Sequence, residues 1–309
     1  MKQEKIVLGA GTKYPLNGML TLPEGKGQFP AVVFVHGSGS SNMDEKVGRL
    51  TPFKDLAEGL AKHGIASLRY DKRSFAHGLK MVLDRKLTIT VKEETVEDAI
   101  LAAELLRADP RIDPEKIFVV GHSMGAMLAP RIDAEGGNFH GLILMAGTLR
   151  RLEEVLLEQS REVLGKMNPL LRRIAGGQIR KMEELFADID TVSDEEAKKR
   201  KAGGGTTLYY FREINAYPTA ECLKQSDKPI LIMQGTEDVQ VSVEKDFEGY
   251  RQLLQGRENV TFKLYEGLNH AFVPSVYGDL SKVKQEYNVE QRIGENVIAD
   301  LAEWIFAYV

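Results

Sequence analysis

Cysteine, tryptophan and long apolar runs are scarce in this sequence of 309 residues. The single cysteine, Cys222, excludes an internal disulfide, which is typical of proteins from a reducing compartment. No stretch approaches the roughly 20 consecutive apolar residues that a membrane-spanning helix requires. Residues 1–10 alternate charged and apolar side chains and lack the apolar core of a secretion signal. These absences predict a cytoplasmic protein with no membrane partner.

An excess of charge of one sign is also missing. The 45 acidic residues nearly balance the 41 basic ones, and the net charge is −4 at pH 7. No basic field therefore exists to concentrate nucleic acid or anionic lipid, and polyanion binding is not expected. Histidine, cysteine and carboxylate residues show no metal-ligand spacing, and no Gly-x-Gly-x-x-Gly follows a predicted strand. We therefore expect neither a metal nor a cofactor.

Apolar runs alternate with segments of helical periodicity along much of the chain. Strands separated by helices predict an α/β protein with a mostly parallel sheet. The predicted strands are 4–8, 16–22, 31–35, 65–70, 117–120, 142–146, 229–233 and 260–265. The predicted helices are 52–63, 93–108, one after 125, 244–254 and one ending near 305.

This alternation stops between residues 148 and 217, where helix-favouring residues show no strand pattern. We interpret 148–217 as a helical cap inserted into a core formed by 1–147 and 218–309. Gly203-Gly204-Gly205 is interpreted as a mobile joint between cap helices, since a phosphate loop would need a preceding strand. Apolar cap residues at helical spacing are expected to be buried, and some to line an acyl pocket. They are Leu149, Leu152, Val155, Leu156, Leu170, Leu171 and Phe186.

The segment from Gly121 to Gly125 reads Gly-His-Ser-Met-Gly and matches the pattern Gly-x-Ser-x-Gly. An apolar strand precedes it and a helix follows it, which is the context that this motif requires. The glycines allow a sharp turn that exposes the serine oxygen. The motif predicts that Ser123 is a nucleophile and that His122 points away from it. A tight turn that contains serine by chance is the alternative.

A serine hydroxyl needs a base, and a third group must orient that base. His270 is the only histidine late enough in the chain for the order serine, acid, histidine, and it follows the strand 260–265. Asp238 lies beyond the carboxyl end of the strand 229–233, where parallel sheets place their sites. Glu237 is its nearest competitor. A surface histidine and a solvated loop carboxylate are the structural alternatives for the two positions.

Attack by serine on a carbonyl creates an oxyanion, which backbone N–H groups stabilise. The amide of Met124, at the start of a helix, is one expected donor. The other is expected from the loop after the strand 31–35, where the Ser38 amide is favoured and the Gly39 amide is the alternative. The further residues expected in the substrate loops are His36, Gly37, Gly39 and His122.

Together these motifs resemble the α/β-hydrolase superfamily over essentially the whole chain. The segment Arg69–Arg73, the helical insertion and the run Asn269–Phe272 resemble bacterial carboxylesterases related to cinnamoyl and feruloyl esterases. The resemblance implies a cofactor-free ester hydrolase whose cap shapes the acyl or phenolic pocket, and often a homodimer. Ala126 stands where those relatives commonly have a second glycine. The charges of Arg69–Arg73 are interpreted as ion pairs that shape a loop.

We therefore predict a serine carboxylesterase that forms an acyl-enzyme with small or medium acyl or aromatic esters. Acylaminoacyl and prolyl-type peptidases use the same groups, but they usually carry a propeller domain for which 309 residues leave no room. A non-catalytic hydrolase-like binding module would lack one of the three catalytic groups, and this sequence contains all three.

Overall fold

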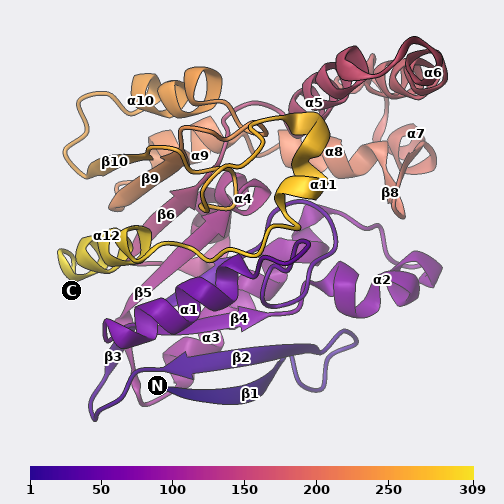
Figure 1. The fold of residues 1–309 in the computed structure, drawn as a ribbon. Helices are drawn as coiled ribbons and strands as arrows, with labels where there is room; N and C mark the ends of the chain where they lie inside the picture. The colour runs from indigo at the N-terminus through magenta and orange to yellow at the C-terminus, as the bar shows by residue number, and fades with distance from the viewer.

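An eight-stranded sheet forms the centre of the computed structural model, which describes residues 1–309 (Figure 1). The strand order is β1-β2-β4-β3-β5-β6-β9-β10, and all neighbours from β4 to β10 are parallel. Strands β1 and β2 add an antiparallel edge. The strands are β1 (Lys2–Leu8), β2 (Leu16–Leu22), β3 (Phe29–Val35), β4 (Ala66–Tyr70), β5 (Ile112–His122), β6 (Gly141–Met145), β9 (Ile230–Gly235) and β10 (Val260–Tyr265). The predicted mostly parallel sheet is confirmed.

Helices cover both faces of this sheet. They are α1 (Pro52–Lys62), α2 (Arg73–Leu83), α3 (Glu97–Ala108), α4 (Met124–Ile132), α5 (Leu152–Lys166), α6 (Pro169–Phe186), α7 (Asp194–Lys199), α8 (Leu208–Asn215), α9 (Thr219–Gln225), α10 (Glu248–Leu253), α11 (Val283–Glu286) and α12 (Glu295–Phe306). Short turns of other helical types are η1 (Lys92–Val96), η2 (Asp133–Gly137), η3 (Val243–Phe247) and η4 (Leu280–Lys282). None of the helices has both the length and the apolar character needed to cross a bilayer.

The core lies on both faces of the central strands because successive side chains of a strand point to opposite sides. Val33 and Val119 pack in the cluster that includes α3 and α4. Phe34 and Val120 pack in the cluster that includes α1 and α12. A strand buried on both faces consists of consecutive apolar residues, which is why the run 31–35 was recognisable in the sequence.

The predicted cap segment contains a small hairpin as well as helices α5 to α8 (Figure 1). Strand β7 (Lys201–Gly203) pairs with β8 (Thr206–Thr207) in an antiparallel arrangement. The expectation of a segment without strands was therefore wrong. Gly203 ends β7, and Gly204 and Gly205 form the turn of this hairpin, so the three residues do not join two helices directly; their φ values are 104°, 58° and 86°. Only glycine adopts such angles at little cost, so the turn explains the run of three.

Two apolar residues of the cap segment are exposed although their spacing predicted burial. Leu152 and Phe186 are buried as expected, but Leu170 and Leu171 expose 71% and 51% of their surface. Both lie in the first turn of α6, which packs against α5. Helical spacing predicts which residues share a face of a helix, but it does not show whether another element covers that face.

Candidate active site

Ser123 occupies the sharp turn between β5 and α4. Its φ of 55° and ψ of −119° lie outside the regions that non-glycine residues favour, so the backbone is strained at this residue. A Cβ on Gly121 would lie 2.3 Å from the carbonyl oxygen of Gly125, and one on Gly125 would lie 2.1 Å from that of Val35. Both positions therefore require glycine. The turn leaves Ser123 half-buried at the carboxyl end of the sheet.

Asp238 and His270 meet on the loops that follow the adjacent parallel strands β9 and β10. The distance from Nδ1 of His270 to Oδ2 of Asp238 is 2.7 Å. The side chain of Gln234 and the backbone amide of Gln240 also donate to this carboxylate, each at 2.8 Å. Because a carboxylate oxygen accepts, we assign the ring proton to Nδ1, which leaves Nε2 free to act as a base. Glu237, the competing acid, is exposed to solvent.

The turn that carries Ser123 contacts the histidine loop through His122. Nε2 of His122 lies 2.9 Å from the carbonyl oxygen of His270, and the two ring centroids are 4.8 Å apart. The hydroxyl of Ser123 makes no hydrogen bond to His270 in this structure. Catalytic hydrogen bonds of this kind often tighten only when substrate binds. His122 therefore connects the nucleophile turn to the loop of the base.

Glu45 is a site residue that the sequence analysis missed. Its buried carboxylate contacts two predicted site segments: Oε1 accepts a hydrogen bond of 2.8 Å from the Gly37 amide, and Oε2 lies 3.0 Å from Nδ1 of His122. Its backbone φ is 51°, a second strained position beside the site. One side chain thus connects the predicted oxyanion loop to the nucleophile turn. A lone glutamate in a polar loop belongs to no motif, so the sequence offered no signal.

Glu45 and His122 form a buried ion pair. Burial raises the pKa of Glu45, but His122 and the Gly37 amide outweigh this effect and hold that pKa below its ordinary value. Burial lowers the pKa of His122, but the Glu45 carboxylate outweighs it and raises that pKa above its ordinary value. Both ring nitrogens of His122 face oxygen atoms, which also favours the protonated ring.

The predicted oxyanion loop is held by a buried lysine. Nζ of Lys72 donates to the carbonyl oxygens of Gly37 at 2.9 Å and Gly39 at 3.0 Å. Burial lowers the pKa of Lys72, which lies 3.7 Å from the carboxylate of Glu94. With these carbonyls turned toward Lys72, the amides of Ser38 and Gly39 have no acceptor within the protein. Either amide is free to bind an oxyanion, as is the equally unpaired amide of Met124.

His36 lies under this loop and not on its surface. It is fully buried, its ring packs against Phe53 and Tyr70, and its Nε2 lies 3.0 Å from the carbonyl oxygen of Asn42. Burial lowers the pKa of His36 to about 4, so the ring is neutral at pH 7. The structure thus gives His36 a supporting position, away from the space that a substrate would occupy.

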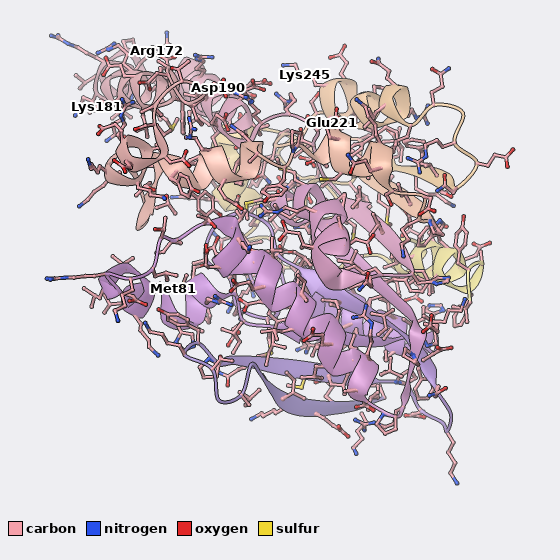
Figure 2. All side chains as sticks on the ribbon, turned by 180° about the vertical axis from the view of Figure 1, so that it is seen from behind. Met81, Arg172, Lys181, Asp190, Glu221 and Lys245 are labelled. Atoms are coloured by element: carbon pink, nitrogen blue, oxygen red, sulfur yellow. The ribbon has the colours of Figure 1, made fainter.

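A cavity of about 450 Å³ opens beside the oxyanion loop. Ser38 and Met124, whose amides are the two predicted oxyanion donors, line it. Leu156 and Phe211 contribute apolar surface from the predicted cap. Met81 of helix α2, labelled in Figure 2, also lines it. The cavity therefore extends from the predicted oxyanion site into largely apolar surroundings.

Arg69, in β4, and Arg73, after it, form ion pairs, as their interpretation from the sequence expected. Nε of Arg69 lies 2.8 Å from Asp44, and Arg73 binds Asp98 through two nitrogens. Cys222 is half-buried, and burial raises the pKa of its thiol. No group of three or more histidine, cysteine, aspartate or glutamate side chains is arranged to hold a metal ion.

A family model described as serine aminopeptidase, S33, matches residues 28–274. The chain belongs to this family. Among curated relatives of the S33 chain, Esterase EstD of Thermotoga maritima is 35% identical over 290 residues, which are 94% of this chain and 65% of EstD. The chain thus spans slightly less than two thirds of the length of this relative.

Two solved structures show the fold that the S33 chain adopts. The Pyrococcus furiosus esterase Pf2001 matches with a TM-score of 0.59 at 17% identity, over 99% of this chain and 91% of that one. Est1E from Butyrivibrio proteoclasticus matches with a TM-score of 0.55 at 16% identity, over 96% and 99%. These likenesses confirm the predicted α/β-hydrolase fold, and the identity with EstD confirms the resemblance to esterases.

Proposed function

We propose that this S33-family chain is a carboxylic ester hydrolase whose catalytic groups are Ser123, His270 and Asp238. The observation that carries the proposal is the hydrogen bond of 2.7 Å between Asp238 and His270 beside the strained turn of Ser123. A serine becomes nucleophilic when a neighbouring base is oriented in this way. The 35% identity with a protein named as an esterase supports ester substrates.

In the proposed reaction, Oγ of Ser123 attacks the ester carbonyl carbon while its proton passes to Nε2 of His270. The carbonyl oxygen becomes an oxyanion, which accepts hydrogen bonds from the Met124 amide and an amide of the Ser38–Gly39 loop. Collapse of this intermediate expels the alcohol, which takes the proton from His270, and leaves the acyl group on Ser123. Water then attacks the acyl group with the same proton transfer, and release of the acid restores the serine.

The cavity favours small or medium apolar acyl groups, aromatic ones included. It is lined by Ser38 and Met124, whose amides are the proposed oxyanion donors, and we place the acyl group of the ester in it. Its volume of about 450 Å³ and the side chains of Met81, Leu152 and Leu156 suit an apolar group of limited size.

The same cavity disfavours an amino-terminal peptide, despite the name of the family. A site for an α-ammonium group needs a carboxylate that is not already neutralised. The only charged residue that lines the cavity is Glu94, which accepts a hydrogen bond of 2.8 Å from the hydroxyl of Tyr210 and lies 3.7 Å from the ammonium of Lys72. We therefore propose esters, rather than peptides with a free amino terminus, as the substrates.

Covalent labelling together with a substrate panel tests this proposal. A fluorophosphonate should label the parent protein and a Ser160→Ala control, whose substitution lies in α5, but not Ser123→Ala. Ester kcat/KM should fall by about 10⁴- to 10⁶-fold in Ser123→Ala, because the triad acts as a unit. Acyl esters of graded length and feruloyl esters should be hydrolysed faster than aminoacyl anilides. Labelling of Ser123→Ala, or faster cleavage of the anilides, would overturn the proposal.

A further inference from the structure

Helix α2 presents an apolar face to solvent. Phe75, Leu79, Val82 and Leu83 expose 52%, 76%, 52% and 70% of their surfaces. They lie at positions i, i+4, i+7 and i+8 and therefore share one side of the helix. Large apolar side chains gathered in this way on a surface mark a site of interaction. Lys80 of the same helix is also exposed; its ammonium donates to the carbonyl oxygen of Lys13 and forms no ion pair with a carboxylate.

Helix α6 repeats this combination of exposed apolar and basic side chains. Leu170, Leu171 and Ile174 are exposed in its first two turns. Its first 13 residues, 169–181, include basic residues but no acidic one. The basic residues are exposed and form no ion pair with a carboxylate, and they are Arg172, Arg173, Arg180 and Lys181. Arg85 and Lys86, just after α2, are likewise exposed and unpaired.

Helices α2 and α6 lie at the same end of the molecule, with α7 and β8 between them (Figure 1). Seen from behind, Met81 of α2 and Arg172 and Lys181 of α6 again lie toward one end (Figure 2). The near balance of acidic and basic residues in the whole chain conceals this local concentration of unpaired basic side chains. We call the exposed apolar and basic residues of 75–86 and 170–181 the docking face.

The α2 part of the docking face adjoins the proposed substrate cavity. Val82 both belongs to the exposed side of α2 and lines the cavity, and its neighbours Gly78 and Met81 line the cavity as well. Gly204, in the turn of the hairpin, lines the same cavity. An apolar molecule held on the docking face would therefore reach the cavity along apolar side chains.

We propose that the docking face binds the surface of an anionic lipid assembly, from which apolar ester substrates enter the cavity. Exposed apolar side chains flanked by unpaired basic ones are the combination that binds such surfaces. A second copy of the chain is the less favourable occupant, because a symmetric contact would bring like basic side chains together. The entry of substrate rests on the proposed esterase function, whereas lipid binding does not.

Vesicle co-sedimentation tests the binding, with the Ser123→Ala protein as parent so that no lipid is hydrolysed. We expect it to bind vesicles that contain phosphatidylglycerol, to release them at high salt, and to bind vesicles of phosphatidylcholine alone more weakly. Leu79→Gln with Leu83→Gln should lower binding by about tenfold or more, because two apolar side chains no longer enter the lipid. The double substitution Leu170→Gln with Ile174→Gln, in α6, should likewise lower vesicle binding by about tenfold or more.

The matched control is Val7→Gln with Leu264→Gln, which alters two apolar residues of β1 and β10 that are 50% and 40% exposed. This control should bind vesicles as the parent does. With Ser123 intact, the Leu79 and Leu83 variant should hydrolyse a soluble acetyl ester normally, because neither residue lines the cavity, but lose turnover of long-chain esters in anionic micelles.

Absence of vesicle binding, or equal binding by the two pairs of helix variants and the control, would overturn the proposal. A stable dimer that dissociates in the Leu79 and Leu83 variant, without vesicle binding by the parent, would assign the docking face to a second copy. Vesicle binding without hydrolysis of any ester would support the docking face and overturn both the esterase function and the entry of substrate.

Discussion

Replacing Glu45 tests whether one buried carboxylate positions both the oxyanion loop and the nucleophile turn. Glu45→Gln keeps an oxygen that can accept from the Gly37 amide, but it removes the charge beside His122. Glu45→Ala removes both contacts and leaves two buried nitrogen atoms without a partner. Comparison of the two variants separates the loss of charge from the loss of the hydrogen bond.

The expected losses of stability and of kcat in the Glu45 variants follow from these contacts. Removal of one partner of a buried ion pair costs about 3 to 5 kcal/mol, so Glu45→Ala should lose stability by roughly that amount. One oxyanion donor lowers the activation barrier by about 2.7 to 4 kcal/mol. In Glu45→Ala the loop of Gly37 should be displaced, which removes part of this stabilisation and lowers kcat by about tenfold to a hundredfold. Glu45→Gln should recover most of that kcat, because the bond to Gly37 remains. KM should change little, since Glu45 does not line the cavity.

The pH dependence of stability gives a second measure of the pair. The pKa of Glu45 lies below its ordinary value of 4.5, so its contribution is present above 4.5 and is lost as the pH falls through the lowered pKa. The pKa of His122 lies above its ordinary value of 6.5, so its contribution is complete below 6.5 and is lost as the pH rises through the raised pKa. The stability lost in Glu45→Gln should therefore be largest between pH 4.5 and 6.5.

Urea unfolding at a series of pH values and steady-state kinetics with a soluble ester check these expectations. A stability difference that does not vary with pH would show that Glu45 and His122 are not an ion pair. A folded Glu45→Ala protein with the kcat of the parent would show that Glu45 does not position the oxyanion loop. Either result would refute the reasoning from the contacts of this side chain.

Two further predictions concern the base and the cavity. Asp238→Asn should lower kcat by about 10⁴-fold, because the imidazole of His270 would be held in the wrong tautomer. If the variant keeps more than about a tenth of the turnover, Asp238 is not the catalytic acid. Leu156→Ala should change the ratio of kcat/KM between aromatic and acetyl esters by about tenfold or more, the effect of one apolar contact, whereas Leu149→Ala, outside the cavity lining, should leave the ratio unchanged. Parallel losses on both esters in Leu156→Ala would leave the cap segment a structural role only.

The positions of the strands along the chain and of the nucleophile turn were predictable because each has a strong local signal. Central strands buried on both faces, such as 117–120, appear as continuous apolar runs. The glycines around Ser123 are required by contacts shorter than 3 Å that any Cβ would make. Asp238 and His270 follow adjacent parallel strands, so their meeting follows from the topology.

Features that depend on contacts between distant segments were not predictable. Helix α2 was not predicted at all: it contains Gly78, and its apolar residues face solvent as well as the core. The exposure of Leu170 depends on what lies beyond α6, which no periodicity reveals. The contact of Glu45 with His122 joins positions 45 and 122, and no motif connects them.

The distribution of the site over the strand ends has a consequence for folding. His122 and His270 are 148 positions apart in the chain, and Asp238 and His270 follow the last two strands of the sheet. During synthesis the chain emerges from its N-terminus, so the Ser123 turn can form long before its proposed base exists. Under the proposed mechanism, a nascent or truncated chain that lacks β10 therefore holds an inert serine. Recovery of hydrolysis during refolding would report that the C-terminal strands have joined the sheet. A measurement of helix formation alone would not detect this event.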